Sequence, residues 1–522
     1  MTDTYDIAVL GSGFGGSLIS MIARRLGLRV LMLERGTHPR FAIGESTSPL
    51  TNLILEQLGN TWDLPFLVPF CTYGAWKKTY PEVGVGLKRG FTYYDHRAGQ
   101  PFVRDCNHST QLMVAASPRD EIGDTHWLRS DFDEFVMHRA VELGVDYVDS
   151  LNITDLSKDE HGMWAVSGSR MGEPFSATAQ LLIDATGPRG ILHRLLGLQE
   201  TEFADFPKTQ ALFSHFTNVH RCDQLAEYAV PGVPPYPADD AALHHCFYGG
   251  WTWVLRFENG VTSAGISVTD ELAAELGLPG DLEAAWQRYL DRFPSVRVHL
   301  GDAVPTLPFV YSSRLSYRAE AAAGDGWVML PSAAAFLDPL FSTGIPLTLL
   351  GIERLGVLLK EHWGKGSLSS ALNAYGASTM AELDSSAEFI GASLRSLSVF
   401  PVFTAFSQFY FAAASYSEMA RRLGKRHLVS RFLAADRADF RSGMTRCITE
   451  MNEVLQNPTP EAIAAFERNV AAAIDCINIA GLADPAKQNW YGVELRDLVV
   501  NAHKLELTPE EMQEIIETAD WV

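Results

Sequence analysis

The chain of 522 residues has the composition of a globular protein, with 47% hydrophobic and 20% charged residues, which is sufficient for a large core. Its 63 Asp and Glu residues outnumber its 42 Lys and Arg residues, so the formal net charge is −21. No run of Lys or Arg offers a footprint for phosphates, which argues against nucleic acid as a partner and against attachment to an anionic membrane surface.

Several features of the sequence favour a cytoplasmic protein. The first residues, MTDTYDIAVLG, contain no basic segment and lead directly into a predicted strand, so we expect no signal peptide. The six cysteines lack CxxC spacing, which predicts buried thiols of a reducing compartment and neither a disulfide framework nor a zinc site. We therefore expect no bound metal. The sequence leaves both a monomer and a homodimer open.

A βαβ unit is predicted at the start of the chain, where an apolar strand (DIAVL) precedes a glycine-rich turn, a helix (SLISMIARRLG) and a second strand (RVLMLE). The turn has GxGxxG spacing at Gly11, Gly13 and Gly16, and Glu34 lies 18 residues beyond Gly16. Glycines permit a tight turn, the helix N-terminus can hold a pyrophosphate, and the carboxylate can accept hydrogen bonds from a ribose hydroxyl. The pattern predicts a dinucleotide-binding site.

The following segments alternate between helix and strand. Residues 129–145 predict an amphipathic helix, and LLIDATG at 181–187 predicts a buried strand that ends in a turn. Residues 205–310 show the alternation of strands, and residues 327–351 return to strand, turn and helix. The pattern predicts an α/β protein.

After residue 370 the pattern is helical to the end, with a capping signature at Thr508-Pro509-Glu510-Glu511. The longest uncharged stretch, residues 396–417, contains Pro401, Gln408 and several serines, which favours a buried, aromatic-rich helix over a membrane span. We expect residues 1–395 to form a nucleotide-binding domain interleaved with a mostly antiparallel substrate-domain sheet, mainly 205–310. Residues 396–522 would form a helical region that covers the active site.

Two segments resemble FAD-binding proteins of the glutathione-reductase type, in the branch that contains aromatic hydroxylases and flavin-dependent halogenases. They are HPRFAIGESTSP at 38–49 and DATG at 184–187. The resemblance implies a Rossmann domain that binds FAD. Since only one GxGxxG unit is present, the resemblance also implies that electrons come from a separate NAD(P)H:flavin reductase. The implied FAD-binding residues are Gly11, Gly13, Phe14, Gly15, Gly16, Glu34, Arg35, Arg40, Glu45, Ser46, Arg129, Asp184, Gly187, Asp338, Pro339, Gly344 and Ile345.

Two of these positions carry further expectations. Asp338 is the one acid near the following motif that could serve the ribityl or pyrophosphate region of FAD. Arg129 falls where related proteins have an arginine near the flavin pocket, although it could instead pair locally with Asp131 or Asp133.

The segment AAFLDPLFSTGIP, residues 334–346, resembles the FxxPxxSxG pattern of flavin-dependent halogenases, in which backbone amides hold a halide beside the flavin. Backbone N–H groups at a turn before a helix suit an anion. The resemblance implies that Thr343 and Gly344 face chloride or bromide and that Ser342 shapes the turn. A flavin-contacting turn of the hydroxylase kind is the alternative. The matching positions are Phe336, Pro339, Ser342 and Gly344.

The segment GVGLKRGFTYYDHRAGQP, residues 84–101, resembles the part of pyrrole- and phenol-type halogenases that bears their catalytic lysine, and Lys88 falls on that lysine. In this family reduced flavin and O2 form a C4a-hydroperoxide, halide attack on it yields hypohalous acid, and the lysine captures or hydrogen-bonds that acid. Burial can lower the pKa of a lysine enough for a nucleophilic role. A solvated charge is the alternative.

The segment LHHCFYGGWTWVLRFENG, residues 243–260, resembles the halogenase region that holds a WxWxIP signature, which keeps the organic substrate away from the flavin. Trp251 and Trp253 match, whereas Leu255 and Arg256 replace Ile-Pro. The alternative is that both tryptophans simply fill the core, as aromatic residues at i and i+2 on one strand face often do.

Together these resemblances imply an FADH2-dependent halogenase that chlorinates or brominates an electron-rich aromatic substrate. Phe341 stands where tryptophan-specific halogenases typically carry Glu, which favours a phenol or pyrrole-like compound over free tryptophan. The alternative is an FAD-dependent monooxygenase that hydroxylates a small aromatic, peptide or protein substrate, which Arg256 in place of proline would favour.

Overall fold

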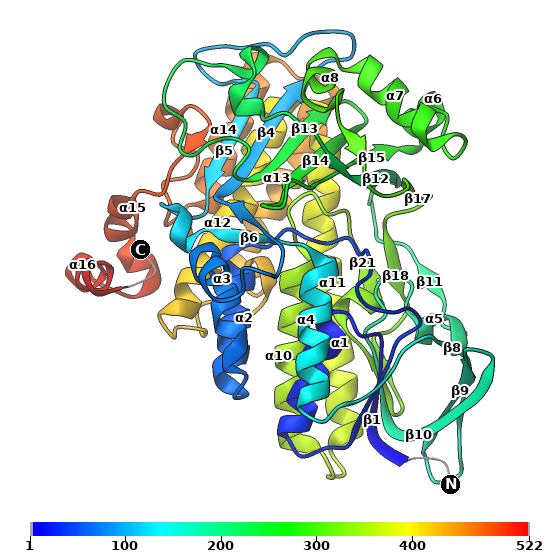
Figure 1. Ribbon diagram of the computed structural model, residues 1–522. Coiled ribbons are helices and arrows are strands. Elements are labelled where there is room, and N and C mark those ends of the chain that lie inside the picture. The colour runs from blue at the N-terminus through cyan, green and yellow to red at the C-terminus, as the bar shows by residue number, and fades with distance from the viewer. Residues whose placement is uncertain (1–3, 520–522) are drawn as a thin grey trace.

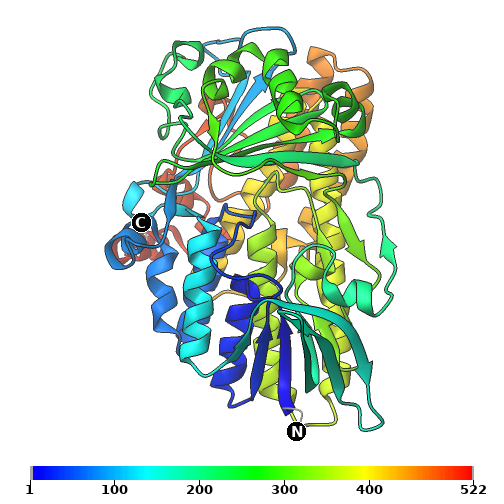
Figure 2. The ribbon, with the colours of Figure 1, turned by 45° about the vertical axis from the view of Figure 1, so that its right-hand side comes forward.

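The computed structural model describes residues 4–519, in which two large sheets lie at opposite ends of the molecule (Figures 1 and 2). The eight-stranded sheet lies at the lower end and the nine-stranded sheet at the upper end. Helices from the second half of the chain pack beside both sheets. This arrangement confirms the predicted α/β class with a nucleotide-binding unit and a second, mostly antiparallel sheet.

The predicted βαβ unit is confirmed: β1 (Thr4–Leu10), α1 (Phe14–Arg25) and β2 (Val30–Leu33) follow one another, with β1 and β2 parallel. Glycine is required in the turn, because Gly11 has φ +97°. A Cβ at Gly16 would lie 1.9 Å from the carbonyl oxygen of Gly11. The helix can therefore start close against the strand only with glycine at these positions.

The eight-stranded sheet has the order β19-β20-β10-β1-β2-β7, with β8 and β9 extending it beside β10. The predicted strand and turn at 181–187 correspond to the end of β10, and the predicted helix at 129–145 is α4. The bounds are α4 (Arg129–Glu142), β7 (Asp146–Val148), β8 (Leu151–Lys158), β9 (Trp164–Arg170), β10 (Glu173–Asp184), β19 (Ala323–Gly324) and β20 (Trp327–Met329).

The nine-stranded sheet has the order β16-β12-β15-β14-β13-β4-β5-β22, with β17 beside β12. Its pairs are antiparallel except for β13 with β4 and β5 with β22. The prediction missed the strands from 90–115 and 490–491. The bounds are β4 (Gly90–His96), β5 (Gln111–Ala115), β12 (Thr209–Thr217), β13 (Ala242–Phe247), β14 (Gly250–Arg256), β15 (Thr262–Thr269), β16 (Val304–Pro305), β17 (Val310–Ser312) and β22 (Trp490–Tyr491).

Three helices cover the outer face of the nine-stranded sheet, while other elements join the two sheets (Figure 2). The covering helices are α6 (Asp270–Leu276), α7 (Leu282–Arg292) and α8 (Pro294–Leu300). The connecting elements are α2 (Pro49–Thr61), α3 (Tyr73–Thr79), β3 (Val85–Lys88), β6 (Asp124–Trp127), α5 (Ile191–Leu195), β11 (Glu200–Thr201), β18 (Tyr317–Ala319), α9 (Pro331–Ala334) and β21 (Ala335–Phe336).

The C-terminal part is helical as predicted, apart from β22. The aromatic stretch at 396–417 lies in a buried helix, and the expected capping box joins Thr508 and Glu511. Within residues 4–519, no helix is long and apolar enough to cross a membrane. The helices are α10 (Gly344–His362), α11 (Leu368–Ser396), α12 (Phe400–Arg422), α13 (Ala438–Gln456), α14 (Pro460–Ile474), α15 (Leu495–Val500) and α16 (Pro509–Thr518).

All six cysteines are free thiols, but the prediction that they are buried is wrong for three of them. Cys106 is exposed, and Cys71 and Cys476 are partly exposed. Cys222, Cys246 and Cys447 are buried. Spacing along the chain predicted the lack of disulfides without predicting where each side chain lies in the fold.

Candidate active site

A cavity of about 380 Å³, here called the first cavity, lies where α1 begins. It brings together most of the residues expected to bind FAD and halide, although they come from positions throughout the first two thirds of the chain. Those that line it are Gly13, Phe14, Gly15, Arg40, Glu45, Ser46, Arg129, Gly187, Trp251, Trp253, Pro339, Ser342, Thr343, Gly344 and Ile345. The expected residues outside the lining are Gly11, Gly16, Glu34, Arg35, Lys88, Asp184 and Asp338.

One end of the first cavity suits a pyrophosphate. The N-cap residue Gly13 has no side chain to cap α1, and the N–H of Phe14 donates to Asp133 Oδ1 at 3.3 Å. The guanidinium groups of Arg40 and Arg129 approach Gly13 beside this carboxylate. The Nε of Arg40 is buried without a hydrogen-bond partner among the described residues. A helix N-terminus with two nearby cations favours an anionic group. Arg129 also forms the ion pair within its own helix that the sequence left open: its Nε and Nη2 donate to the Asp133 carboxylate at 2.8 Å each.

Glu34 lies at the end of β2 beside this anionic end. Its carboxylate accepts hydrogen bonds from the N–H of Ser12 at 3.1 Å and from the N–H of Gly36 at 2.9 Å. Burial acts to raise the pKa of Glu34, but Arg40 and these N–H groups outweigh it and hold the pKa below its usual value. The group is thus an ionised acceptor at the position that the motif predicts for a ribose hydroxyl. The neighbouring Arg35 is exposed.

The fit to FAD extends to Glu45. Its Oε1 lies 2.7 Å from His215 Nε2, whereas its Oε2 is buried without a partner among the described residues. Since buried polar atoms are normally satisfied, this oxygen is a candidate acceptor for a bound group. The residues present therefore fit the cofactor that the sequence predicts.

The predicted halide turn stands at the start of α10. Ser342 adopts φ +56°, and no side chain caps the helix that follows Thr343. A Cβ at Gly344 would meet no atom within 4 Å, so the backbone here borders open space. Free N–H groups in the first turn of a helix form a site for a small anion. Ser342 and Thr343 are buried, whereas Gly344 is exposed where it lines the cavity.

Asp338 lies behind the halide turn, not on the cavity wall. Its carboxylate accepts hydrogen bonds from Trp251 Nε1 at 3.0 Å, Ser267 Oγ at 2.6 Å and the N–H of Leu340 at 3.2 Å. Burial raises the pKa of Asp338 to about 6. These hydrogen bonds hold Trp251 and the turn in place. The position of Asp338 does not support the expected contact with FAD.

Asp184 also turns away from the first cavity. It accepts hydrogen bonds from the N–H and Oγ1 of Thr186 at 2.9 and 2.6 Å and from the N–H of Leu192 at 2.8 Å. These bonds shape the turn after β10, so that Gly187 lines the cavity while Asp184 stays in the core. Asp184 therefore supports the wall, and the expected direct contact with FAD lacks geometric support.

Trp251 and Trp253 line the first cavity from one face of β14, together with Leu255. Their ring centroids are 5.7 Å apart, and both rings are nearly fully buried. Arg256 points to the opposite face, where its Nε donates to Asp239 Oδ1 at 2.8 Å. Arg256, whose presence in place of proline favoured a hydroxylase, therefore lies on the far side of the strand from the cavity.

Lys88 is completely buried, which rules out the alternative of a solvated charge. Its Nζ donates to Ser46 Oγ at 2.9 Å and to the carbonyl oxygen of Thr47, and lies 3.8 Å from the ring centroid of Phe91. Burial lowers the pKa of Lys88, and the nearby Asp124 opposes this shift. Such a group can exchange between an ammonium donor and a neutral nucleophilic amine.

A second cavity, of about 150 Å³, lies beyond Lys88. Sequence reasoning did not identify its residues, although the aromatic stretch at 396–417 indicated an apolar wall there. Most of its lining is apolar, with Ser48, Ser415, Glu418 and Glu494 as polar exceptions. The lining includes Ser48, Phe91, Val114, Ala115, Tyr410, Phe411, Ala414, Glu418, Met419, Leu482 and Leu498.

The wall between the two cavities is formed by the segment around Lys88. Ser46 lines the first cavity and Ser48 the second, while Lys88 bonds to Ser46 and to the intervening Thr47. Phe91, against which the ammonium group packs, lines the second cavity. Lys88 thus stands between the two chambers.

An aromatic layer continues this wall. His244, which lines the first cavity, stacks on Tyr93 with ring centroids 4.3 Å apart. The ring centroid of Phe341 lies 4.8 Å from that of Tyr410, which lines the second cavity. Phe341 therefore contributes an apolar ring to the partition. The arrangement separates the first cavity, at the starts of α1 and α10, from the smaller and mostly apolar second cavity.

Comparison with known proteins agrees with this geometry. The tryptophan halogenase family model matches residues 125–395, about half of the chain. The monodechloroaminopyrrolnitrin halogenase PrnC of Pseudomonas fluorescens is 30% identical over 359 residues, 68% of this chain and 61% of that protein. The tetracycline 7-halogenase of Kitasatospora aureofaciens is 30% identical over 66% of this chain and 61% of its own length. The chain thus matches about three fifths of each of these relatives.

The fold also resembles solved structures. The structure of halogenase PltM in complex with phloroglucinol and FAD matches 93% of this chain and 99% of its own, with a TM-score of 0.81 and 22% identity. The structure of CmlS, a flavin-dependent halogenase, gives a TM-score of 0.58 over 91% of this chain and 78% of its own, with 20% identity. On the family match, the chain belongs to the tryptophan halogenase family, the family of flavin-dependent halogenases.

Proposed function

We propose that this protein is an FAD-dependent halogenase that uses O2 and chloride or bromide to halogenate a small, electron-rich aromatic compound. The observation that carries the proposal is the position of Lys88, buried in the wall between the two cavities. A hydroxylase would need its substrate beside the flavin, whereas a lysine in a partition suits transfer of a small electrophile between two chambers.

The first cavity would bind both FAD and the halide. The start of α1, with Arg40 and Arg129, would hold the pyrophosphate of FAD, and the start of α10 would hold the halide. Reduced FAD supplies, with O2, the oxidising equivalents that convert halide into hypohalous acid. Trp251 and Trp253 would exclude the organic substrate from this chamber.

Lys88 would then aim the electrophile. As a neutral amine it can displace hydroxide from hypohalous acid, which forms an N–X bond and releases water after proton transfer. As an ammonium ion it can instead hydrogen-bond the hypohalous acid. Its two fixed acceptors, Ser46 Oγ and the Thr47 carbonyl oxygen, hold Nζ in the wall in either state.

The second cavity would bind the aromatic substrate. A chamber of about 150 Å³ with an apolar lining suits a single substituted ring. Glu418 would accept a hydrogen bond from a phenol hydroxyl or pyrrole N–H, which raises the electron density of the ring during attack. The relatives include a 1H-pyrrole-2-carbonyl carrier-protein brominase and a tetracycline halogenase, which supports an electron-rich ring as the substrate class.

We further propose that a separate NAD(P)H:flavin reductase supplies reduced FAD and that the protein acts in the cytoplasm as a monomer or homodimer. Support for the reductase comes from the sequence, in which one GxGxxG unit, at residues 11–16, is found, within the βαβ unit at residues 4–33. Activity in a coupled assay should depend on adding the reductase.

Mass spectrometry of the product tests the proposal. The protein would be incubated with a flavin reductase, NADH, chloride or bromide and a panel of phenols and pyrroles, and products would be examined for halogen isotope patterns. Lys88→Ala should abolish the halogenated product, whereas the exposed Lys78→Ala should leave it unchanged. A product heavier by one oxygen atom, formed without halide, would show that the protein is a hydroxylase.

A further inference from the structure

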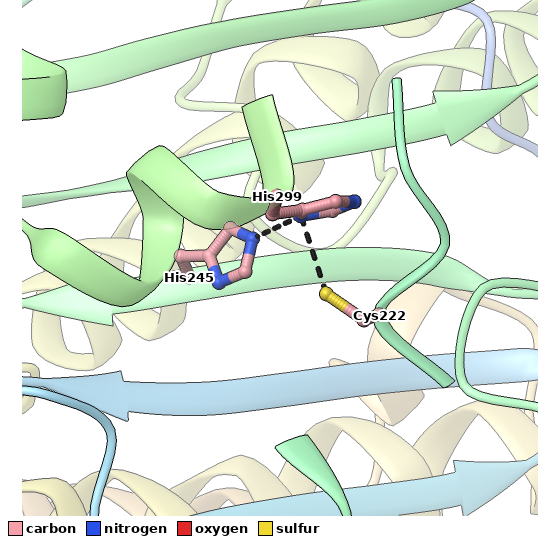
Figure 3. A group of neighbouring side chains, drawn as sticks. All are labelled: Cys222, His245 and His299. Atoms are coloured by element: carbon pink, nitrogen blue, oxygen red, sulfur yellow. Dashed lines mark hydrogen bonds between the residues drawn. The ribbon is translucent and has the colours of Figure 1, made fainter. Parts of the chain in front are cut away.

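One cysteine and two histidines form a buried cluster between the nine-stranded sheet and α8 (Figure 3). Cys222 comes from the short 3-10 turn Cys222–Gln224, His245 from β13 and His299 from α8. All three side chains are fully buried. His245 points away from the first cavity, since its neighbour His244 lines that cavity from the other face of the strand.

We propose that Cys222, His245 and His299 bind a divalent transition-metal ion of the zinc type. One ligand atom from each residue lies within 4.8 Å of the others. His299 Nδ1 is 2.9 Å from His245 Nε2 and 3.2 Å from Cys222 Sγ. Sulfur and imidazole nitrogen are the ligand atoms that Zn²⁺ prefers.

These distances are close to those of a coordination sphere. Tetrahedral Zn²⁺ with ordinary Zn–N and Zn–S bonds places two nitrogens about 3.3 Å apart and a nitrogen and a sulfur about 3.6 Å apart. His299 Nδ1 would thus have to move only about 0.4 Å away from each of the other two ligand atoms, which side-chain torsions can supply. The remaining pair, His245 Nε2 and Cys222 Sγ, lies within 4.8 Å.

Two ligand atoms of the cluster compete for one partner. The Sγ of Cys222 and the Nε2 of His245 both face Nδ1 of His299, which as an acceptor offers a single lone pair. The Nε2 of His299 is buried without a hydrogen-bond partner among the described residues, 3.8 Å from the carboxylate of Asp239. A cation placed between the three ligand atoms would be bound by all of them at once.

The groups around the cluster have the arrangement of a second coordination shell. With His299 bound through Nδ1, its Nε2–H points at Asp239, and Arg256 Nε holds that carboxylate at 2.8 Å. With His245 bound through Nε2, its Nδ1–H can donate to His96 Nε2 at 2.9 Å. Carboxylates and other acceptors commonly fix metal-bound histidines in this way.

This network also explains Arg256, which replaces the proline of the halogenase signature. Its guanidinium group orients Asp239 and also donates to the carbonyl oxygens of Val219 and His220, on the segment that leads to Cys222. The ion would fasten this loop and α8 to β13, and none of the three ligands lines either cavity. We therefore assign the ion a structural role.

The cysteine spacing predicted no zinc site, because the ligands are a single cysteine and two histidines that are 23 to 77 residues apart in the sequence. Long-range folding alone brings them together. Burial raises the pKa of the Cys222 thiol and lowers the pKa of both histidines, so the imidazoles are neutral and the thiol would release its proton when metal binds.

Cobalt titration of the full chain tests the proposal. We expect wild-type protein treated with a chelator and then titrated with Co²⁺ to develop a thiolate-to-cobalt charge-transfer band that saturates at one ion per chain. Cys222→Ser should lose the band. Cys447→Ala, which removes a buried thiol in α13, should keep it. Absence of the band in wild-type protein, or its persistence in Cys222→Ser, would overturn the proposal.

A variant outside the ligand set keeps the test valid if Cys222→Ser fails to fold. Asp239→Asn retains all three ligands and should weaken metal affinity by about 10- to 100-fold, which competition with a metallochromic indicator would measure. Elemental analysis of protein grown with added zinc should find one zinc ion per chain in wild type. Equal affinities for wild type and Asp239→Asn would contradict the assigned second shell.

Discussion

The two cavities of the active site differ in how they are built. The first is lined by short motifs, such as the turn that opens α1 and the turn that opens α10. The second is lined by groups of residues from α12 and the segment 479–498 and by residues of β4 and β5, which come from parts of the chain that are far apart in the sequence. A cofactor and an anion need backbone geometry that short motifs encode, whereas an apolar chamber needs only side chains of suitable size.

The largest effect, on FAD affinity, is expected from adding a side chain in the glycine-rich turn beside the first cavity. In Gly16→Val the Cβ would overlap the carbonyl oxygen of Gly11, so α1 must shift and FAD affinity should fall at least about 100-fold. Flavin absorbance after gel filtration measures this loss. Gly366→Val, at a glycine with open space around it, is the control. Full FAD binding by Gly16→Val would contradict the assigned pyrophosphate site.

A reciprocal pair of variants tests whether the two chambers act independently. Ala414→Phe should fill the second cavity and raise KM for the aromatic substrate about tenfold, with FAD affinity unchanged. Ala42→Phe should obstruct the first cavity and weaken FAD binding instead. Steady-state kinetics and flavin titration of both variants give the comparison. Loss of FAD in Ala414→Phe would mean that the partition is wrong.

A smaller effect is expected at Glu418, which bonds to Arg422 at 2.8 Å and lines the second cavity. Glu418→Gln removes the charged acceptor and should lower kcat/KM for phenols by about tenfold or less. Hypohalous acid production should be unchanged. The exposed Glu453→Gln is the matched control. Equal kcat/KM in both variants would remove Glu418 from substrate binding.

The smallest effect concerns stability and pH. Burial raises the pKa of Asp338 from 3.8 to about 6, so the folded state holds a proton that the unfolded state has lost between those values. The stabilisation is therefore complete below pH 4 and lost as the pH rises towards 6. Asp338→Asn should flatten this decline in Tm, a change of roughly a few degrees. An unchanged decline would show that Asp338 is ionised in the folded state.

The elements encoded by local sequence could be predicted, and those made by long-range pairing could not. The βαβ unit, α4 and the turn before α10 follow from glycines and hydrophobic periodicity. The strands β4 and β5 were missed. β4 pairs with β13, more than 100 residues away, and β5 pairs with β22, more than 300 residues away, so their places in the sheet depend on long-range pairing.

The candidate site shows the same difference between features that short motifs encode and features that depend on the folded structure. Lys88, Trp251 and the halide turn could be found from their motifs, and the structure places all three at the first cavity or its wall. Asp338 and Asp184 were expected to reach FAD, but hydrogen bonds that the sequence does not reveal turn them into the core. Residue type predicted that these positions matter without predicting the direction in which each side chain points.

The most direct test of the two-chamber account measures where hypohalous acid goes in Lys88→Ala. The reaction would run with a flavin reductase, bromide, a phenol and a soluble trap for hypobromous acid, and the ratio of brominated trap to brominated phenol would be compared with wild type. We expect Lys88→Ala to consume O2 as fast as wild type and to shift bromination from the phenol to the trap. Normal bromination of the phenol by Lys88→Ala would contradict the two-chamber account.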